Sequence, residues 1–184
     1  MANDRRGQFD ALVAPHMERL FRVACRLLGN AHDAQDLVQD TCVVACENLA
    51  ELDSNPHPLR WLLRVQHNRF IDGARRRQRG AVVTLDVSAR AANLASADPG
   101  PEDLLQQAEG ERAFERAFLA LEDTQRTLLS LRAEGYGLEE IEAITGISRE
   151  VLRARLHRAR RSLAQRLDEQ PDAPARASRT RSGT

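Results

Sequence analysis

The sequence predicts an all-α protein made of two small helical domains joined by a flexible acidic linker. Apolar residues recur with a helical period of 3.6 through most of the first 79 residues, and again after about residue 104. The stretch between them carries Gly80, Pro99, Gly100 and Pro101, many small residues and little periodicity. No segment has a convincing strand pattern, and no internal repeat is visible.

The first domain is expected over residues 8–79. An apolar stripe predicts one helix from Phe9 to Leu27 that ends at Gly29-Asn30. A second helix is expected over about 31–49, and a third over about 59–78 after a loop with two prolines. In the second helix, three aspartates at i, i+3 and i+7 form one exposed acidic edge: Asp33, Asp36 and Asp40.

Residues 80–103 are expected to form the linker, with helices resuming at about Glu102. The second domain is placed over residues 104–167. The tail that follows, residues 168–184, lacks large apolar side chains and is expected to be disordered.

Residues 138–161 predict a helix-turn-helix. Gly146 ends a short helix, and Ser148 is a suitable N-cap for a second one. One face of the second helix carries leucines, and the opposite face carries Arg and His. This pattern is typical of a DNA-reading helix. The alternative is an ordinary helical hairpin with a solvated basic face.

The net charge is zero, but the charges are segregated along the chain. Residues 31–53 carry six acidic residues and no Arg. Residues 80–111 carry six acidic residues and one Arg. By contrast, 60–79 and 148–167 each carry seven Arg against one acidic residue. Such a chain can hold a polyanion at two places while offering acidic faces to a basic protein.

Several classes of protein are disfavoured. No apolar run approaches the roughly 20 residues that span a bilayer, and no signal peptide is visible, so a cytoplasmic protein without membrane insertion is expected. There is no Gly-rich phosphate loop, HExxH or nucleophile motif, which predicts a protein that is not an enzyme and needs no cofactor. The five His are too scattered to nominate a metal site. Three Cys argue against a disulfide framework; small core residues are favoured over a thiol sensor or metal site.

Three motifs resemble those of the extracytoplasmic-function (ECF, group IV) sigma factors, the smallest sigma-70 relatives. The segment DAQDLVQDT, from Asp33 to Thr41, resembles a motif of the sigma-2 domain. WLLRV from Trp61 and NRFID from Asn68, followed by the Arg run, resemble the helix that handles the −10 promoter element. Gly146-Ile-Ser148 and RLHRAR from Arg155 resemble the sigma-4 recognition helix. The resemblance covers about residues 8–167.

The resemblance implies a promoter-specificity subunit of RNA polymerase. Its expected partners are core polymerase (the clamp helices of the largest subunit and the flap of the second), promoter DNA and a cognate anti-sigma factor. The acidic edge would bind the polymerase clamp, through Asp33, Asp36, Gln39 and Asp40. Residues 50–58 would form a loop with a pocket for a flipped base. Contacts to the −10 element would come from Arg60, Trp61, Arg64, His67, Asn68, Arg75, Arg76, Arg77 and Arg79.

The −35 element would lie against the second basic helix. Its expected contacts are Ser148, Arg149, Glu150, Arg153, Ala154, His157, Arg158 and Arg161. Trp61 is as well explained by core packing as by stacking on a base. The sequence departs from the family at Glu150 and Val151, where a Gly-Thr pair is usual, and this leaves the −35 specificity open.

Two other functions stay open. One is a conventional helix-turn-helix regulator of duplex DNA, and the other is a sigma mimic that sequesters a partner without starting transcription. The acidic edge and the first basic helix disfavour a regulator, because a repressor would need neither a docking edge nor a single-strand platform.

Overall fold

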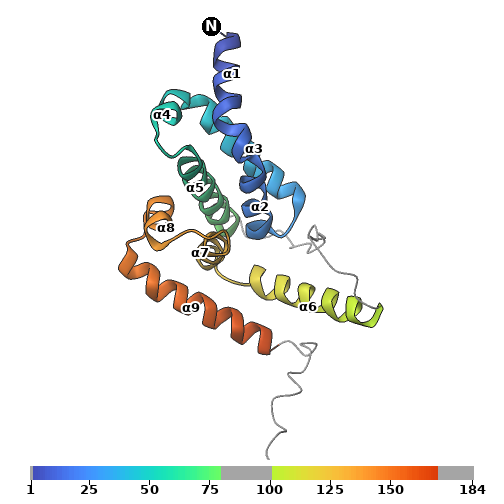
Figure 1. Cartoon of the computed structure of the whole chain (residues 1–184). Coiled ribbons are helices and arrows are strands. Elements are labelled where there is room, and N and C mark those ends of the chain that lie inside the picture. Colours follow the sequence, from blue (N-terminus) through green and yellow to red (C-terminus); the bar gives the residue numbers. More distant parts are fainter. Residues whose placement is uncertain (1, 80–100, 170–184) are drawn as a thin grey trace, which may run out of the picture.

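A computed structural model of the chain describes residues 2–79 and 101–169, which form helices and short turns without any strand (Figure 1). The predicted all-α class with two helical domains is confirmed. The N-terminal domain contains α1 (Ala2–Val13), a 3-10 turn η1 (Ala14–His16), α2 (Met17–Leu28), α3 (Ala31–Glu47), α4 (Leu49–Ser54) and α5 (Pro58–Arg79). The C-terminal domain contains α6 (Pro101–Leu119), α7 (Asp123–Ala133), α8 (Leu138–Thr145) and α9 (Arg149–Asp168).

The predicted single helix from Phe9 to Leu27 is wrong, because η1 divides it into α1 and α2. Pro15 lies in this turn, and a proline has no amide hydrogen to continue the helical ladder. The predicted end at Gly29 is confirmed: its φ is 72°, and its N–H donates to the Cys25 carbonyl at 2.8 Å.

The predicted loop over 50–58 is also wrong, because α4 occupies most of it and only residues 55–57 connect α4 to α5. Asn48 ends α3 by donating to the Val44 carbonyl from both its backbone N–H and its side chain. The short α4 then buries Leu49 and Leu52, and this packing explains why the segment stays helical.

Most of the predicted linker and tail lie outside the described residues, in 80–100 and 170–184. The last three residues of the predicted linker are already helical, because α6 begins at Pro101. Proline suits this position, since its fixed φ fits the first turn and its missing N–H would have had no helical partner.

One hydrophobic core runs through both domains. It joins Leu20 and Leu62 of the N-terminal domain to Leu128, Ile141 and Leu152 of the C-terminal domain. Helix α7 contacts α2 and α5, α8 contacts α5, and α9 packs on α7 and α8 (Figure 1). The two domains are therefore packed face to face, an arrangement called the closed arrangement below.

Candidate nucleic-acid and partner interface

The acidic edge of α3 is exposed as predicted. Asp33, Asp36, Gln39 and Asp40 are all open to solvent, while their neighbours Leu37 and Thr41 are buried. Asp33 has a local role as well: its N–H donates to Asn30 Oδ1 at 2.7 Å, and its carboxylate accepts from Asn30 Nδ2 at 2.8 Å. This reciprocal pair fixes the start of α3 and the orientation of the edge.

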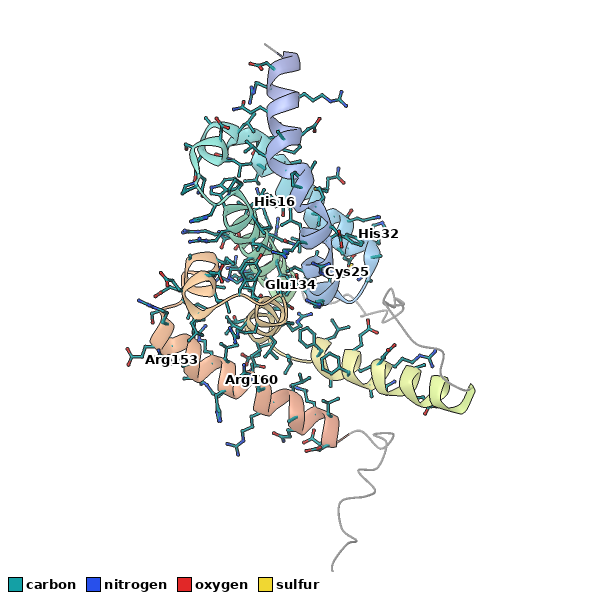
Figure 2. The ribbon with its side chains drawn as sticks, viewed as in Figure 1. His16, Cys25, His32, Glu134, Arg153 and Arg160 are labelled. Atoms are coloured by element: carbon teal, nitrogen blue, oxygen red, sulfur yellow. The ribbon has the colours of Figure 1, made fainter. Side chains whose placement is uncertain are left out.

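His32 lies beside this edge at the start of α3 (Figure 2). Its Nδ1 is 3.5 Å from Asp36 Oδ2, and ligand atoms of His32, Asp33 and Asp36 lie within 4.8 Å of one another. The sequence reading named no metal site here. All three residues are exposed, and the group forms part of the charged edge.

Helix α5 presents a basic surface that begins near its first turn. Most of the predicted −10 residues are exposed: Arg64, Asn68, Arg75, Arg76, Arg77 and Arg79. Arg60 and Trp61 are half-buried. Trp61 packs against the core, and its Nε1 donates to Glu51 Oε1 of α4 at 2.8 Å. The indole is thus held on α4, with part of its ring at the surface.

His67 does not lie on the basic surface of α5. Its exposed fraction is 9%, and burial lowers its pKa to about 4. His67 follows Leu63 by four residues and precedes Phe70 by three, and both of these neighbours are buried. That spacing was the signal that His67 belongs to the core-facing side of α5.

Helix α9 exposes the whole of its predicted −35 surface. Ser148, Arg149, Glu150, Arg153, Ala154, His157, Arg158 and Arg161 are all exposed. The opposite side is anchored by Leu152, Leu156 and Ala159, which are buried. Figure 2 shows Arg153 on the outer side of α9, away from the packed domains. A helix anchored in this way can enter a major groove.

The turn before α9 differs from the prediction in one hydrogen bond. Gly146 ends α8 with φ of 71°, and its N–H donates to the Glu142 carbonyl at 2.8 Å. Ser148 occupies the N-cap position of α9, but its side chain makes no capping bond. Instead, Glu142 Oε1 accepts from the Arg149 N–H at 3.2 Å, and Oε2 lies 2.9 Å from Arg149 Nε. A carboxylate on α8 therefore caps α9.

The three cysteines have free thiols. Cys25 and Cys42 are half-buried, and burial raises the pKa of each thiol, which disfavours the reactive thiolate. Cys42 Sγ lies 3.7 Å from Met17 Sδ. Cys46 is exposed, so the expectation of a buried core residue is wrong for this position.

Among the described helices, none combines the length and the apolar character needed to cross a membrane.

Two family models match the chain. "Sigma-70 region 2" matches residues 12–80, which include α3 and α5, and "Sigma-70, region 4" matches residues 111–163, which include α8 and most of α9. These matches define a sigma-70-type protein, and they contain the acidic edge, α5 and all of the predicted −35 residues.

Curated relatives narrow the class. The ECF RNA polymerase sigma factor SigF of Caulobacter vibrioides is 32% identical over 143 residues, which cover 77% of this chain and 75% of the relative. SigW of Bacillus subtilis is 26% identical over 172 residues, which cover 89% of this chain and 92% of SigW. SigE of Mycolicibacterium smegmatis is 32% identical, but the chain spans only 60% of its length. The chain belongs to the ECF family of RNA polymerase sigma factors.

Two solved structures share the arrangement of helices. The sigma factor RpoE in complex with the anti-sigma factor NepR, from Bartonella quintana, matches with a TM-score of 0.69 and 25% identity over 88% of this chain and 97% of that one. CnrH in complex with the cytosolic domain of CnrY matches with a TM-score of 0.58 and 26% identity over 87% of each chain.

Proposed function

We propose that this protein recruits core RNA polymerase to specific promoters and starts transcription there, as a sigma factor without enzymatic activity of its own. The observation that carries the proposal is the placement of an acidic edge and two basic helices within the matched sigma-70 regions. The polymerase supplies the chemistry, and the cytoplasm is where the protein would act.

The acidic edge is the proposed polymerase contact. Asp33, Asp36, Gln39 and Asp40 project from one exposed side of α3, whose other side is anchored in the core. An edge of this charge suits the basic clamp helices of the largest subunit, where opposite charges steer association and fix the register. The C-terminal domain would contact the flap of the second subunit.

The basic surface of α5 is the proposed −10 contact. Its exposed arginines can follow the phosphates of a separated strand, and the surface part of Trp61 can stack on a base. His67 is left out of this contact in the closed arrangement, because its ring is buried.

The outer face of α9 is the proposed −35 contact. Arginine makes bidentate hydrogen bonds with guanine, and Arg153 lies near the N-terminal end of the helix, where recognition helices contact bases. Glu150, the second residue of α9, would repel phosphate and can accept a hydrogen bond from cytosine N4.

A cognate anti-sigma factor is a proposed partner, because both matched structures are complexes of a similar chain with a second protein. The facing sides of the two domains are already packed together in this chain. A regulator of the closed arrangement would therefore wrap around the domains and would not lie between them.

Run-off transcription with purified core polymerase and a genomic fragment library tests the proposal. Discrete starts that depend on the protein are expected, and alignment of the start sites would give both promoter elements. The absence of starts together with tight duplex binding by the protein alone would support a conventional regulator. The absence of starts with intact polymerase binding would support a sigma mimic.

A further inference from the structure

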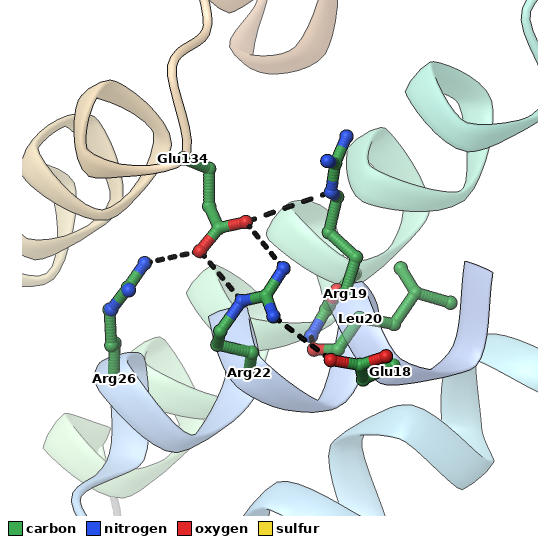
Figure 3. Close-up of polar contacts among 7 residues, drawn as sticks. Glu18, Arg19, Leu20, Arg22, Arg26 and Glu134 are labelled. Atoms are coloured by element: carbon green, nitrogen blue, oxygen red, sulfur yellow. Dashed lines mark hydrogen bonds and ion pairs between the residues drawn. The ribbon is translucent and has the colours of Figure 1, made fainter. Parts of the chain in front are cut away.

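A single carboxylate of the C-terminal domain is held by three arginines of the N-terminal domain (Figure 3). Glu134, at the end of α7, accepts two hydrogen bonds from Arg22: Nε to Oε1 at 3.0 Å, and Nη2 to Oε2 at 3.1 Å. Arg26 Nη1 lies 2.5 Å from Oε1, and Arg19 Nε lies 3.7 Å from Oε2. All three arginines project from the same side of α2, toward α7.

The environment of Glu134 makes this contact more than a surface ion pair. Its side chain is only 5% exposed. Burial raises the pKa of its carboxyl, but hydrogen bonds and charges from Arg22 and Arg26 outweigh burial and lower it. The pKa of Arg22 is raised, mainly by its hydrogen bond to Glu134. A buried carboxylate is stable only with such partners, so separation of the domains must release or rehydrate the whole cluster.

The closed arrangement cannot engage both promoter elements. Helix α8 packs on α5 at one side and on α9 at the other. Packed helices lie about 8–10 Å apart, so the two basic helices are within roughly 20 Å of each other. The −10 and −35 elements are about 25 base pairs apart, which is roughly 85 Å of duplex at 3.4 Å per base pair. The domains must therefore separate before both helices reach DNA.

The two domains share an apolar core, but buried polar groups lie among its helices and some of them lack a hydrogen-bond partner, which weakens the contact. Among the described residues, four buried side-chain atoms of α5 and α7 lack a hydrogen-bond partner: Gln66 Oε1, His67 Nδ1, Arg126 Nε and Ser130 Oγ. Each such atom makes burial less favourable than it would be in an apolar core.

We propose that Glu134 is an electrostatic latch that closes the chain on itself when no partner is present. Clasped by Arg19, Arg22 and Arg26, its carboxylate holds α7 on α2 and keeps the two basic helices too close for a promoter. Polymerase and DNA binding require the latch to open. The latch depends on charge, so salt weakens it.

The test measures the radius of gyration of the full chain by small-angle X-ray scattering at low salt. Glu134→Arg places a cation among three arginines and is expected to open the chain. A compact chain of this length has a radius of gyration of about 16 Å, and separation of the domains is expected to raise the measured value by about a quarter or more. Asp168→Arg makes the same charge change at the exposed end of α9 and is expected to leave the radius unchanged.

A variant with the charges exchanged across the contact tests whether Glu134 acts through the arginines of α2. In the Glu134→Arg background, adding Arg22→Glu and Arg26→Glu restores opposite charges across the contact and is expected to return the radius toward the wild-type value. Raising the salt from 50 to 500 mM should expand the wild-type chain and leave the already open Glu134→Arg variant unchanged.

The proposal is overturned if Glu134→Arg keeps its helicity by circular dichroism and stays as compact as wild type. Equal expansion of the Asp168→Arg control would also overturn it. If Glu134→Arg loses helicity, the variant Arg22→Glu is used instead, because it places a second acid beside Glu134 from the side of α2. An Arg22→Glu chain that keeps its helicity and stays as compact as wild type would overturn the proposal. None of these readouts depends on transcription, so failure of the latch is distinguishable from failure of the sigma assignment.

Discussion

Arg126 lies over the Phe70 ring, with its guanidinium carbon 5.3 Å from the ring centroid. The same side chain donates from Nη1 to the Leu27 carbonyl at 2.6 Å and pairs with Asp123 on its own helix. Phe70 belongs to α5 and Leu27 to the last turn of α2, so one guanidinium of α7 joins two helices of the other domain. This contact is a second polar link between the domains, built with the opposite charge to Glu134.

Replacement of Arg126 by methionine should therefore destabilise the closed arrangement. Methionine keeps the packing of the side-chain stem but loses the hydrogen bond to Leu27 and the interaction with the ring. We expect the free energy of unfolding to fall by about 1–3 kcal/mol. Urea unfolding followed by circular dichroism measures this. Arg160→Met, on an exposed residue of α9, serves as the comparison; an equal loss there would contradict the role of Arg126.

Ser148→Ala should have little effect on stability, although Ser148 occupies an N-cap position. Loss of a capping side chain usually costs about 1 kcal/mol. Because Glu142 makes the bond to the start of α9, we expect Ser148→Ala to stay within about 0.5 kcal/mol of wild type. Glu142→Ala should cost more than Ser148→Ala in the same urea titration. The reverse order would show that the serine caps the helix in solution.

Reversal of the acidic edge should weaken polymerase binding. Asp36→Arg combined with Asp40→Arg is expected to weaken the affinity for core polymerase by about tenfold or more, because steering by opposite charge is lost. Binding of isolated −35 duplex by the same variant should be unchanged. Asp10→Arg, on an exposed residue of α1, provides the control. Equal loss of polymerase binding and duplex binding would contradict the assignment of the acidic edge as the polymerase contact.

Arg153→Ala should reduce promoter use through the −35 element. A bidentate contact between arginine and guanine contributes about 1–3 kcal/mol of discrimination. Transcription from an intact promoter should fall accordingly, while a promoter already mutated at −35 should respond little. Arg166→Ala removes an exposed arginine near the far end of α9 and should leave transcription unchanged. If both promoters respond equally to Arg153→Ala, the residue does not read that element.

His67 should make the fold less stable in mild acid. Burial lowers its pKa to about 4, so between about pH 6.5 and pH 4 the unfolded chain binds a proton that the folded chain does not. Stability from the neutral ring is thus complete above pH 6.5 and decreases as the pH falls, by at most about 3 kcal/mol. Urea unfolding at pH 7 and pH 5 measures this, and His67→Gln should reduce the difference between them.

Glu134 acts in a lower pH range. Because its folded pKa is lowered, its contribution is present above the pKa of an unfolded glutamate and is lost as acid protonates the folded carboxylate. The change between pH 7 and pH 5 should therefore come mainly from His67, with a smaller part from His16, whose pKa is also lowered, by burial and by the charge of Arg19. If His67→Gln keeps the wild-type difference, another group is responsible.

Local patterns in the sequence predicted much of the fold. The helix-turn-helix, the exposed aspartates of α3 and the exposed face of α9 follow from apolar residues at helical spacing. His67 was placed on the DNA-binding surface because the resemblance suggested a contact with the −10 strand, although its position between Leu63 and Phe70 indicated burial. The break at Pro15 was also readable, but the continuous apolar stripe on both sides hid it.

The contacts between domains had no comparable signal. Glu134 and Arg22 are 112 residues apart, and neither the spacing nor the residue types around them identify the pair. Arg126 reaches a backbone carbonyl, which has no sequence signature at all. Charge segregation suggested acidic and basic surfaces for external partners, whereas the strongest charged cluster joins two parts of the same chain.

The closed arrangement restricts which residues can replace Gly29. Its left-handed φ of 72° alone would admit asparagine or aspartate at some cost, as many helix ends do. A Cβ at this position, however, would overlap the side chain of Leu119 from the other domain. Any other residue at position 29 would therefore require the Leu119 side chain to move, or a shorter side chain at position 119, for the closed arrangement to form. Positions 29 and 119 are therefore expected to vary together in chains that keep the closed arrangement, although neither position contacts DNA in the proposed complex.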